Sequence, residues 1–292
     1  MNIGITGATG LIGKRLVDRA LQRGHEVIAF SRSPERQIPG CEMRPFSVDA
    51  VPDVSGCAAF VHLAGESVVG LWTPEKKRRI VHSRVEGTRR VAEAILASAH
   101  PPEVLVSASA VGFYADSGDS EITEAAPPGR GFLADTVQAW EEEATKAAAR
   151  TRVVLLRTGI VLAREGGALG TMLPIFKAGL GGKIGTGEQW MPWIHLEDVS
   201  GLILFAVENL DVRGPMNATG PWPVRNSEFT QAVASAVNRP AFFRVPAAAL
   251  RLLGEFSHEL LDSKRVLPAE ATEHGYPFRF PELAPALKDL LG

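Results

Sequence analysis

The residues Asn2-Ile3-Gly4-Ile5-Thr6-Gly7-Ala8-Thr9-Gly10-Leu11-Ile12-Gly13 at the start of the chain decide its fold. Asn2 to Thr6 is a short apolar run, which is typical of a buried strand. Apolar residues then recur with helical spacing from Leu11 to Arg23, and Gly24 ends that helix. The glycine-rich residues therefore form the turn from a first strand into a first helix.

This turn has the spacing GxxGxxG and predicts a site for the pyrophosphate of a dinucleotide. The free N–H groups and the positive dipole end of a helix N-terminus favour a bound phosphate. Gly7 permits the tight turn, Gly10 lets the backbone approach the ligand, and Gly13 lets the helix pack close to the sheet. We expect Thr9, Leu11 and Ile12 to complete the cofactor-binding turn. The alternative is a turn that merely needs glycines, and the position between strand and helix argues against it.

The end of the second predicted strand indicates which dinucleotide binds. His25 to Phe30 is strand-like, and Ser31-Arg32-Ser33 follows, with no acid before Glu35. NAD enzymes usually place an acid here for the ribose 2′-hydroxyl, whereas Arg32 can hold a 2′-phosphate by charge-assisted hydrogen bonds. Ser31 and Arg32 therefore favour NADP(H) as the cofactor. A solvated surface arginine is the alternative interpretation of Arg32.

Strands and helices alternate through the first half of the chain. Further strands are expected at Ala58 to Leu63, Val104 to Ser109 and Val153 to Thr158, and helices at Thr73 to Ala97 and Leu133 to Arg150. Thr73 can cap the long helix, with Pro74 in its first position. The alternation predicts an α/β fold, a doubly wound Rossmann sheet of parallel strands covered by helices on both faces.

The second half is less regular. Residues 166–187 hold eight glycines around the apolar island Leu173 to Phe176, which predicts a mobile loop around a short helix, acting as a lid. Beyond it we expect helices at Glu197 to Glu208, Ser227 to Val237 and Pro246 to Leu261. Strands are expected at Met216 to Thr219 and Ala241 to Val245.

Composition excludes several classes of protein. The 292 residues carry 31 Lys and Arg against 33 Asp and Glu, a net charge of −2, which argues against a nucleic-acid binder. Two cysteines exclude a disulfide scaffold and a four-cysteine zinc site, and no paired-histidine spacing indicates a metal. No apolar run approaches the ~18 residues of a membrane helix. We expect a globular cytoplasmic protein that binds neither nucleic acid, membrane nor metal.

Several motifs together resemble the extended and atypical short-chain dehydrogenase/reductase superfamily, in particular its NAD-dependent epimerase/dehydratase-like branch. Besides the glycine turn, they are His62-Leu63-Ala64-Gly65-Glu66, Ser107-Ala108-Ser109-Ala110-Val111, Pro192-Trp193-Ile194-His195-Leu196-Glu197-Asp198-Val199 and Asn217-Ala218-Thr219-Gly220. The Ser-Arg pair after the second strand, the helix with Trp72 and Ser83-Arg84, and the C-terminal Arg265-Val266-Leu267-Pro268 also fit this branch. The resemblance covers nearly the whole chain.

The resemblance implies a Rossmann domain at 1–165, completed by 190–220, and a small C-terminal α/β substrate lobe formed by 166–189 and 221–292. It implies NADPH as cofactor. It also implies seven further cofactor-binding residues: Asp49, Leu63, Ala64, Gly65, Ser107, Ile160 and Val161. By the resemblance Asp49 contacts the adenine, and the alternative is that Asp49 is an ordinary turn residue.

Arg84 is a cofactor-binding candidate for a separate reason, its place on the long helix. Ile80, Thr88 and Val91 lie on the same stripe, which should be buried. A buried arginine needs an anion or a carbonyl as partner, so the cofactor is one candidate and a structural acid is the alternative.

The expected catalytic pair is missing. Active members of the superfamily carry Tyr-x-x-x-Lys on the helix after the serine strand, but residues 131–141 contain neither tyrosine nor lysine. Ser109 matches the superfamily's catalytic serine, and Tyr114 just beyond it is a candidate replacement acid or a packing residue. His195 is another titratable candidate, although its motif forms a structural turn in relatives.

Two classes of function remain open. The chain is either an NADP(H)-dependent oxidoreductase or epimerase-type enzyme on an unknown small-molecule substrate, or an NADPH sensor or regulatory protein without turnover. The glycine turn and Arg32 support both classes. The missing pair favours the second class, whereas the glycine-rich lid, with Trp190 and Trp193 near it, favours the first. The sequence names no substrate, and it leaves a homodimer open.

Overall fold

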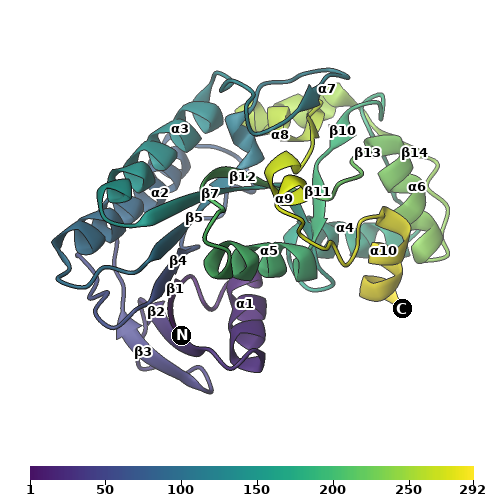
Figure 1. Cartoon of the computed structure of the whole chain (residues 1–292). Helices are drawn as coiled ribbons and strands as arrows, with labels where there is room; N and C mark the ends of the chain where they lie inside the picture. The colour runs from purple at the N-terminus through teal and green to yellow at the C-terminus, as the bar shows by residue number, and fades with distance from the viewer.

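A computed structural model describes all 292 residues and has a seven-stranded parallel sheet at its centre (Figure 1). The strand order is β12-β7-β5-β4-β1-β2-β3, so that the chain winds outward from β1 in both directions. The strands are β1 (Asn2–Thr6), β2 (Glu26–Ser31), β3 (Cys41–Pro45), β4 (Ala59–His62), β5 (Val104–Ala110), β7 (Arg152–Thr158) and β12 (Gly214–Ala218). The predicted doubly wound Rossmann sheet is confirmed.

Helices cover both faces of this sheet. On one face, α1 (Leu11–Gln22) packs beside α5 (Leu196–Glu208). On the other face, α2 (Pro74–Ala97) packs beside α3 (Phe132–Thr145), and the 3-10 helix η2 (Lys146–Ala149) follows α3. The α-helix predicted to reach Arg150 therefore ends at Thr145.

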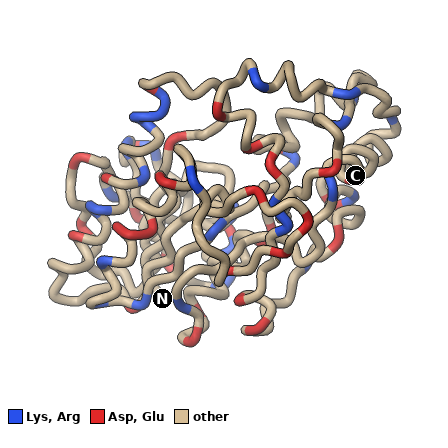
Figure 2. The backbone as a smooth tube through the Cα atoms, turned by 90° about the horizontal axis from the view of Figure 1, so that it is seen from above, with Lys and Arg blue, Asp and Glu red and all other residues tan.

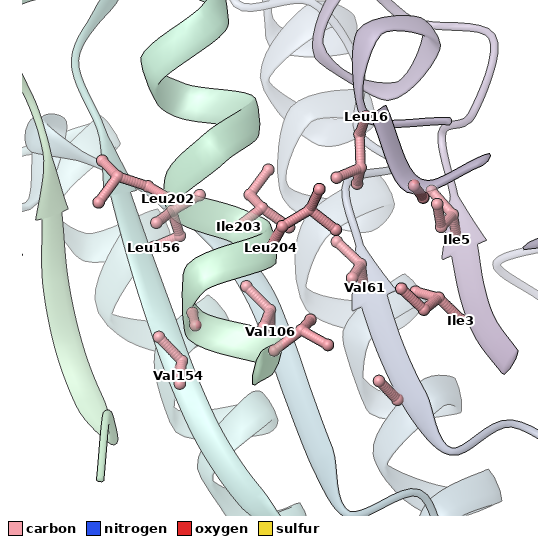
Figure 3. Close-up of a cluster of buried hydrophobic side chains, with 14 of the residues drawn as sticks. Ile3, Ile5, Leu16, Val61, Val106, Val154, Leu156, Leu202, Ile203 and Leu204 are labelled. Carbon is pink, nitrogen blue, oxygen red and sulfur yellow. The ribbon is translucent and has the colours of Figure 1, made fainter. Parts of the chain in front are cut away.

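Each central strand contributes side chains to two separate cores. Val106 of β5 lies in the core beneath α1 and α5, whereas its neighbour Leu105 lies in the core beneath α2 and α3. Figure 3 shows the first core, where α5 residues meet side chains of the strands and of α1. Burial on both faces explains why these strands are apolar at consecutive positions.

Local interactions fix where the helices begin and how they pair. The Thr73 hydroxyl accepts a hydrogen bond from the Lys76 N–H at 3.2 Å, and Pro74 occupies the first turn of α2, as predicted. Between α1 and α5, Arg15 donates to both carboxylate oxygens of Glu197, at 2.5 and 2.8 Å. This two-pronged ion pair holds the starts of the two helices together.

A smaller lobe lies beyond the β12 edge of the sheet (Figure 1). Leu173 of α4 (Gly167–Lys177), Phe229 of α6 (Asn226–Ala236) and Leu287 of α10 (Leu283–Leu291) share its core. Four short strand pairs frame it: β8 (Ile160–Leu162) with β11 (Trp193–His195), β10 (Trp190–Met191) with β13 (Val224–Arg225), β9 (Gly182–Ile184) with β14 (Phe243–Val245), and β6 (Glu121–Ile122) with β15 (Arg265–Val266). The short helices η1 (Val111–Phe113), α7 (Ala247–Leu250), η3 (Arg251–Ser257), α8 (His258–Leu261) and α9 (Ala269–Glu273) complete the chain.

The short helix expected within residues 166–187 is present as α4, at residues 167–177, and Leu169, Leu173 and Phe176 form its buried face. One expectation for the second half is wrong. The helix expected from Pro246 to Leu261 is broken into short pieces, since Gly254 has φ 61° and ψ −140°. The sequence analysis also missed α10.

Charged residues of both signs are interspersed along the chain in Figure 2, in line with the near-zero net charge. Among the helices of the structure, none combines the length and the apolar character needed to cross a bilayer.

His195 has a structural role at the start of α5. Its Nδ1 accepts a hydrogen bond from the Glu197 N–H at 3.1 Å, its ring packs on Phe280, and only 2% of the residue is exposed. Burial lowers the pKa of His195 to about 4, although nearby Asp289 and Glu197 oppose the shift. The neutral imidazole therefore acts as the helix cap.

The unfolding free energy should fall as the pH drops from about 6.5 towards 4. His195 stays neutral in the folded chain through this window but takes up a proton in the unfolded chain, so the unfolded state binds more protons. This costs about 2 kcal/mol between pH 7 and 5. His62, whose pKa burial also lowers to about 4, adds to the effect.

Urea unfolding of His195→Asn at several pH values tests this assignment. Asparagine can still cap α5 but does not titrate, so the variant should show a shallower pH dependence than the wild type. An unchanged slope would contradict the role of His195.

Candidate functional site

The turn between β1 and α1 is shaped by two close backbone approaches. Gly7 has φ +70°, and a Cβ there would lie 2.9 Å from the Leu63 carbonyl carbon. A Cβ on Gly13 would lie 2.1 Å from the Gly7 carbonyl oxygen, which no side chain can tolerate. The Gly10 N–H closes the turn by donating to the Gly7 carbonyl at 2.9 Å. The predicted roles of these glycines in turn and packing agree with this geometry.

The N-terminus of α1 is open to a ligand. Its first backbone hydrogen bond runs from Lys14 to the Gly10 carbonyl, so the N–H groups of Leu11, Ile12 and Gly13 precede it. No side chain caps the helix, its first turn holds no acid, and Thr9 and Gly10 are exposed. These features fit the pyrophosphate of a dinucleotide.

Thr6 fastens the end of β4 to this turn. Its hydroxyl accepts hydrogen bonds from the N–H groups of Leu63 and Ala64, at 3.1 and 3.2 Å, and lies 2.7 Å from His62 Nδ1. Two predicted cofactor residues, Leu63 and Ala64, are thereby placed against Gly7.

The opposite side of the turn, after β2, carries an unpaired cation. Arg32 is exposed and makes no hydrogen bond or ion pair within the chain, while the Ser31 hydroxyl accepts from the Ser33 N–H at 3.1 Å. Lys76 chiefly, with a weaker contribution from Arg32, lowers the pKa of Glu66. The guanidinium of Arg32 is therefore available to an anionic ligand.

The structure places Asp49 in the exposed turn after β3. Its carboxylate lies 3.4 Å from His82 Nε2 of α2, and its N–H donates to the Ser47 hydroxyl. This geometry suits a turn residue and leaves the carboxylate exposed.

Arg84 reaches the end of β4 from α2. Its Nη1 donates to the Glu66 carbonyl at 2.8 Å, and its guanidinium stacks over Trp140 with 5.1 Å to the ring centroid. A Cβ on Gly65 would lie 3.5 Å from the guanidinium carbon. Burial lowers the pKa of Arg84 to about 10. Within the chain, the partner of Arg84 is therefore a backbone carbonyl, and no carboxylate forms an ion pair with it.

A third cation, Lys76, lies near Arg84 and the loop after β4. Its Nζ donates to Glu66 Oε1 at 2.7 Å, and only 15% of its side chain is exposed. The Glu66 N–H in turn donates to the Ser83 hydroxyl at 3.0 Å.

Ser109 is buried and turned towards α3. Its hydroxyl donates to Glu141 Oε1 at 2.5 Å, and Arg157 of β7 binds the same carboxylate through Nε at 2.9 Å and Nη2 at 2.8 Å. Ser107, two residues earlier on the same face of β5, is fully buried. The catalytic-serine candidate therefore donates its hydrogen bond to a carboxylate of the chain.

Tyr114 belongs to the same buried network. Its hydroxyl donates to Asn217 Oδ1 at 2.7 Å and accepts from Arg157 Nη1 at 2.9 Å. Burial raises the pKa of Tyr114, and 2% of the residue is exposed. In this position the Tyr114 hydroxyl is part of the buried network. To protonate a substrate it would have to break its hydrogen bonds to Asn217 and Arg157.

The network continues into the C-terminal segment. Asn217 Nδ2 donates to the Leu267 carbonyl at 2.9 Å, and Glu124 Oε1 accepts from the N–H groups of Asn217 and Glu270. The Arg265-Val266-Leu267-Pro268 motif is thus attached to the end of the central sheet.

Ile160 and Val161 form most of β8, where the chain leaves β7. The Ile160 N–H donates to the Pro192 carbonyl at 2.7 Å. A Cβ placed on Gly167 would lie 3.1 Å from the Val161 carbonyl oxygen and 3.2 Å from Leu11 Cδ2. The phosphate turn, β8 and the start of α4 therefore meet at one place.

A sequence model of the NAD dependent epimerase/dehydratase family matches residues 3–218. The chain belongs to the NAD dependent epimerase/dehydratase family. A model of a domain of unknown function matches residues 245–290, at the end of the C-terminal lobe.

Similar epimerase family proteins match over the whole chain. The chloroplastic SDR39U1 homolog of Arabidopsis thaliana is 38% identical over 100% of this chain and 87% of its own length. The crystal structure of human epimerase family protein SDR39U1 (isoform 2) with NADPH has a TM-score of 0.93 and 35% identity, covering 100% of this chain and 99% of that one. A nucleoside-diphosphate sugar epimerase from Corynebacterium glutamicum has a TM-score of 0.82 and 32% identity, covering 100% of this chain and 58% of that one.

Within this epimerase family fold, the structure brings together only part of the expected site. Several expected cofactor residues lie near one another where β1, β4 and β7 end: the glycine turn, Leu63 to Gly65, Arg84 and Val161. Three others make buried contacts instead, namely Ser107, Ser109 and Tyr114. The sequence analysis missed Glu141 and Arg157. A charged residue inside the apolar strand 153–158, and an acid on the buried stripe of α3, were the available signals.

Gly13→Ala should abolish high-affinity NADPH binding, because the new methyl group would meet the Gly7 carbonyl and push α1 away from the turn. We expect the dissociation constant to rise at least about tenfold, since about 1.4 kcal/mol of lost binding suffices. Fluorescence titration measures it, with Asp18→Ala, an exposed residue one turn further along α1, as the control. Wild-type affinity in Gly13→Ala would contradict the site.

Proposed function

We propose that the chain binds NADP(H) in preference to NAD(H). The observation that carries this proposal is the exposed, unpaired Arg32 directly after β2, beside a phosphate turn whose neighbouring strand end holds no acid. A planar guanidinium suits a 2′-phosphate, which a carboxylate at this position would repel. The NADPH in the structure of the human relative supports the same cofactor.

We also propose that the chain is an oxidoreductase or epimerase-type enzyme acting on a small carbonyl or sugar-type substrate. Ligands of open α/β sheets bind outside the carboxyl ends of the strands. Here β6 and β8, which follow the carboxyl ends of β5 and β7, belong to the strand pairs that frame the C-terminal lobe. When bound there, the cofactor supplies or accepts a hydride. The sugar-nucleotide epimerase among the relatives supports a sugar-type substrate.

Proton exchange in this enzyme does not use a Tyr-x-x-x-Lys pair. In the observed arrangement the Ser109 hydroxyl donates a hydrogen bond to Glu141, and the Tyr114 hydroxyl donates one to Asn217. A positioned acid contributes about 10²–10⁴-fold to such a reaction. We therefore expect slow turnover of ordinary short-chain dehydrogenase substrates, with water or the substrate supplying the proton.

The second candidate function is an NADPH sensor without turnover. The buried network favours it, since the hydroxyls of Ser109 and Tyr114, the two catalytic candidates, are both engaged inside the protein. Two assays distinguish them: NADPH oxidation over a panel of carbonyl compounds, and product analysis of nucleotide sugars for a new epimer, since epimerisation consumes no cofactor overall. Oxidation or epimer formation that depends on one compound supports the enzyme, and tight NADPH binding with neither supports the sensor.

Arg32→Gln should weaken NADPH binding about 10- to 100-fold and leave NADH binding unchanged, because the lost charge-assisted contact is worth about 1.5–3 kcal/mol. Calorimetric titration of both cofactors measures this. Arg36→Gln, an exposed arginine of the same loop, is the matched control and should change neither affinity. Equal wild-type affinities for NADPH and NADH would overturn the proposed preference.

A further inference from the structure

The C-terminal lobe carries a group of strongly exposed apolar side chains. They come from the end of α4, from the turn after it and from the segment that enters β14, which lies on the side of the lobe away from the central sheet (Figure 1). Phe242 is 90% exposed, and Ile175, Leu180 and Phe243 are each more than half exposed. Apolar side chains that protrude together in this way mark a surface for a protein or a membrane.

Contacts within the chain bring these side chains to one place. Arg239 Nε donates to the Lys177 carbonyl at 3.1 Å, which fastens the segment before β14 to the end of α4. Phe243 of β14 pairs with Gly182 of β9 in a parallel register, so Phe242 lies beside the start of β9. We call this surface the lobe tip and define it as residues 175–182 and 239–243.

The charges on and around the lobe tip are all positive. Residues 166–187 and 229–254, which contain the tip, hold five Lys and Arg and no Asp or Glu. These cations are Lys177, Lys183, Arg239, Arg244 and Arg251. None of them forms an ion pair with a carboxylate, and both Arg239 and Arg244 donate to backbone carbonyls. Their charge is therefore not balanced within the chain.

Protruding apolar groups beside unpaired cations fit the surface of an anionic bilayer. Apolar side chains enter the boundary between headgroups and acyl chains, while each Lys or Arg near anionic headgroups strengthens binding about fivefold. A second copy of the chain fits less well, because a two-fold contact would bring the cations of both tips together. A nucleic acid strand gains little from the aliphatic Ile175 and Leu180.

We propose that the lobe tip docks the chain on an anionic membrane surface, with Phe242 as its main apolar anchor and Lys177 and Arg239 beside the lipid headgroups. This interaction is separate from cofactor binding, because α4 begins near Leu11 of the phosphate turn and reaches the tip only at its other end. The charge balance of the whole chain predicts no membrane binding, since it averages the cationic tip with a more acidic remainder.

Vesicle flotation tests the proposal, with vesicles of phosphatidylcholine alone and of an equimolar mixture of phosphatidylcholine and phosphatidylserine. We expect the chain to float with the mixed vesicles and not with the neutral ones, and to dissociate as the salt concentration rises. Phe242→Ser should weaken binding at least about tenfold, because it loses the largest apolar group in contact with lipid. Lys177→Gln should weaken binding about fivefold.

Leu210→Ser is the matched control. Leu210 is 67% exposed but belongs to the central domain, in the loop between α5 and β12, so this variant should bind the mixed vesicles as the wild type does. Since Phe242 makes few contacts with its own chain, Phe242→Ser should keep the wild-type melting temperature. Lost binding in this variant then reflects a lost lipid contact and not a lost fold.

Three results would overturn the proposal. Absence of flotation with the mixed vesicles, or equal flotation of the wild type and Phe242→Ser, excludes the lobe tip as a lipid-binding surface. Dimerisation that Phe242→Ser abolishes, without vesicle binding, shows a contact between copies of the chain. Binding to a single-stranded oligonucleotide in place of the mixed vesicles shows a nucleic-acid surface.

Discussion

The close approach of α1 to the turn after β1 is the constraint on which the rest of the site depends. Because Gly13 lacks a side chain, α1 starts directly against the Gly7 carbonyl, and its free N–H groups point to the edge of the sheet. Thr6 then holds the end of β4 beside the same turn. Small residues and one hydroxyl thus set the place where a phosphate can be bound.

The side chains that can bind an anion and those that could exchange a proton lie in different surroundings. Arg32 and Arg84 have donors free at the edge of the sheet, on either side of the phosphate turn. The groups that could exchange a proton, Ser109 and Tyr114, are instead bound to Glu141, Asn217 and Arg157 in the interior. The same network joins the central sheet to the C-terminal segment through Leu267, so its loss would also loosen the lobe.

The sequence was sufficient wherever the determining interactions are local. The glycine turn, the cap at Thr73 and the buried stripe that contains Arg84 follow from spacing along one helix or one turn. The Glu141–Arg157 pair joins α3 to β7, and only the packing of the two elements brings its members together. In α4, the Leu173 to Phe176 island predicted a short helix, but the surrounding glycines hid the contribution of Leu169 to its buried face. The break at Gly254 depends on a single backbone conformation that spacing does not reveal.

Amide hydrogen exchange with and without saturating NADPH tests the central claim most directly, because it locates the ligand along the chain without a known substrate. The account predicts slower exchange on binding in residues 7–14, 31–35 and 63–67, which are the phosphate turn and the two strand ends beside it. Protection confined to α4, α6 and α10, or no change at saturation, would contradict a cofactor site at this edge of the sheet.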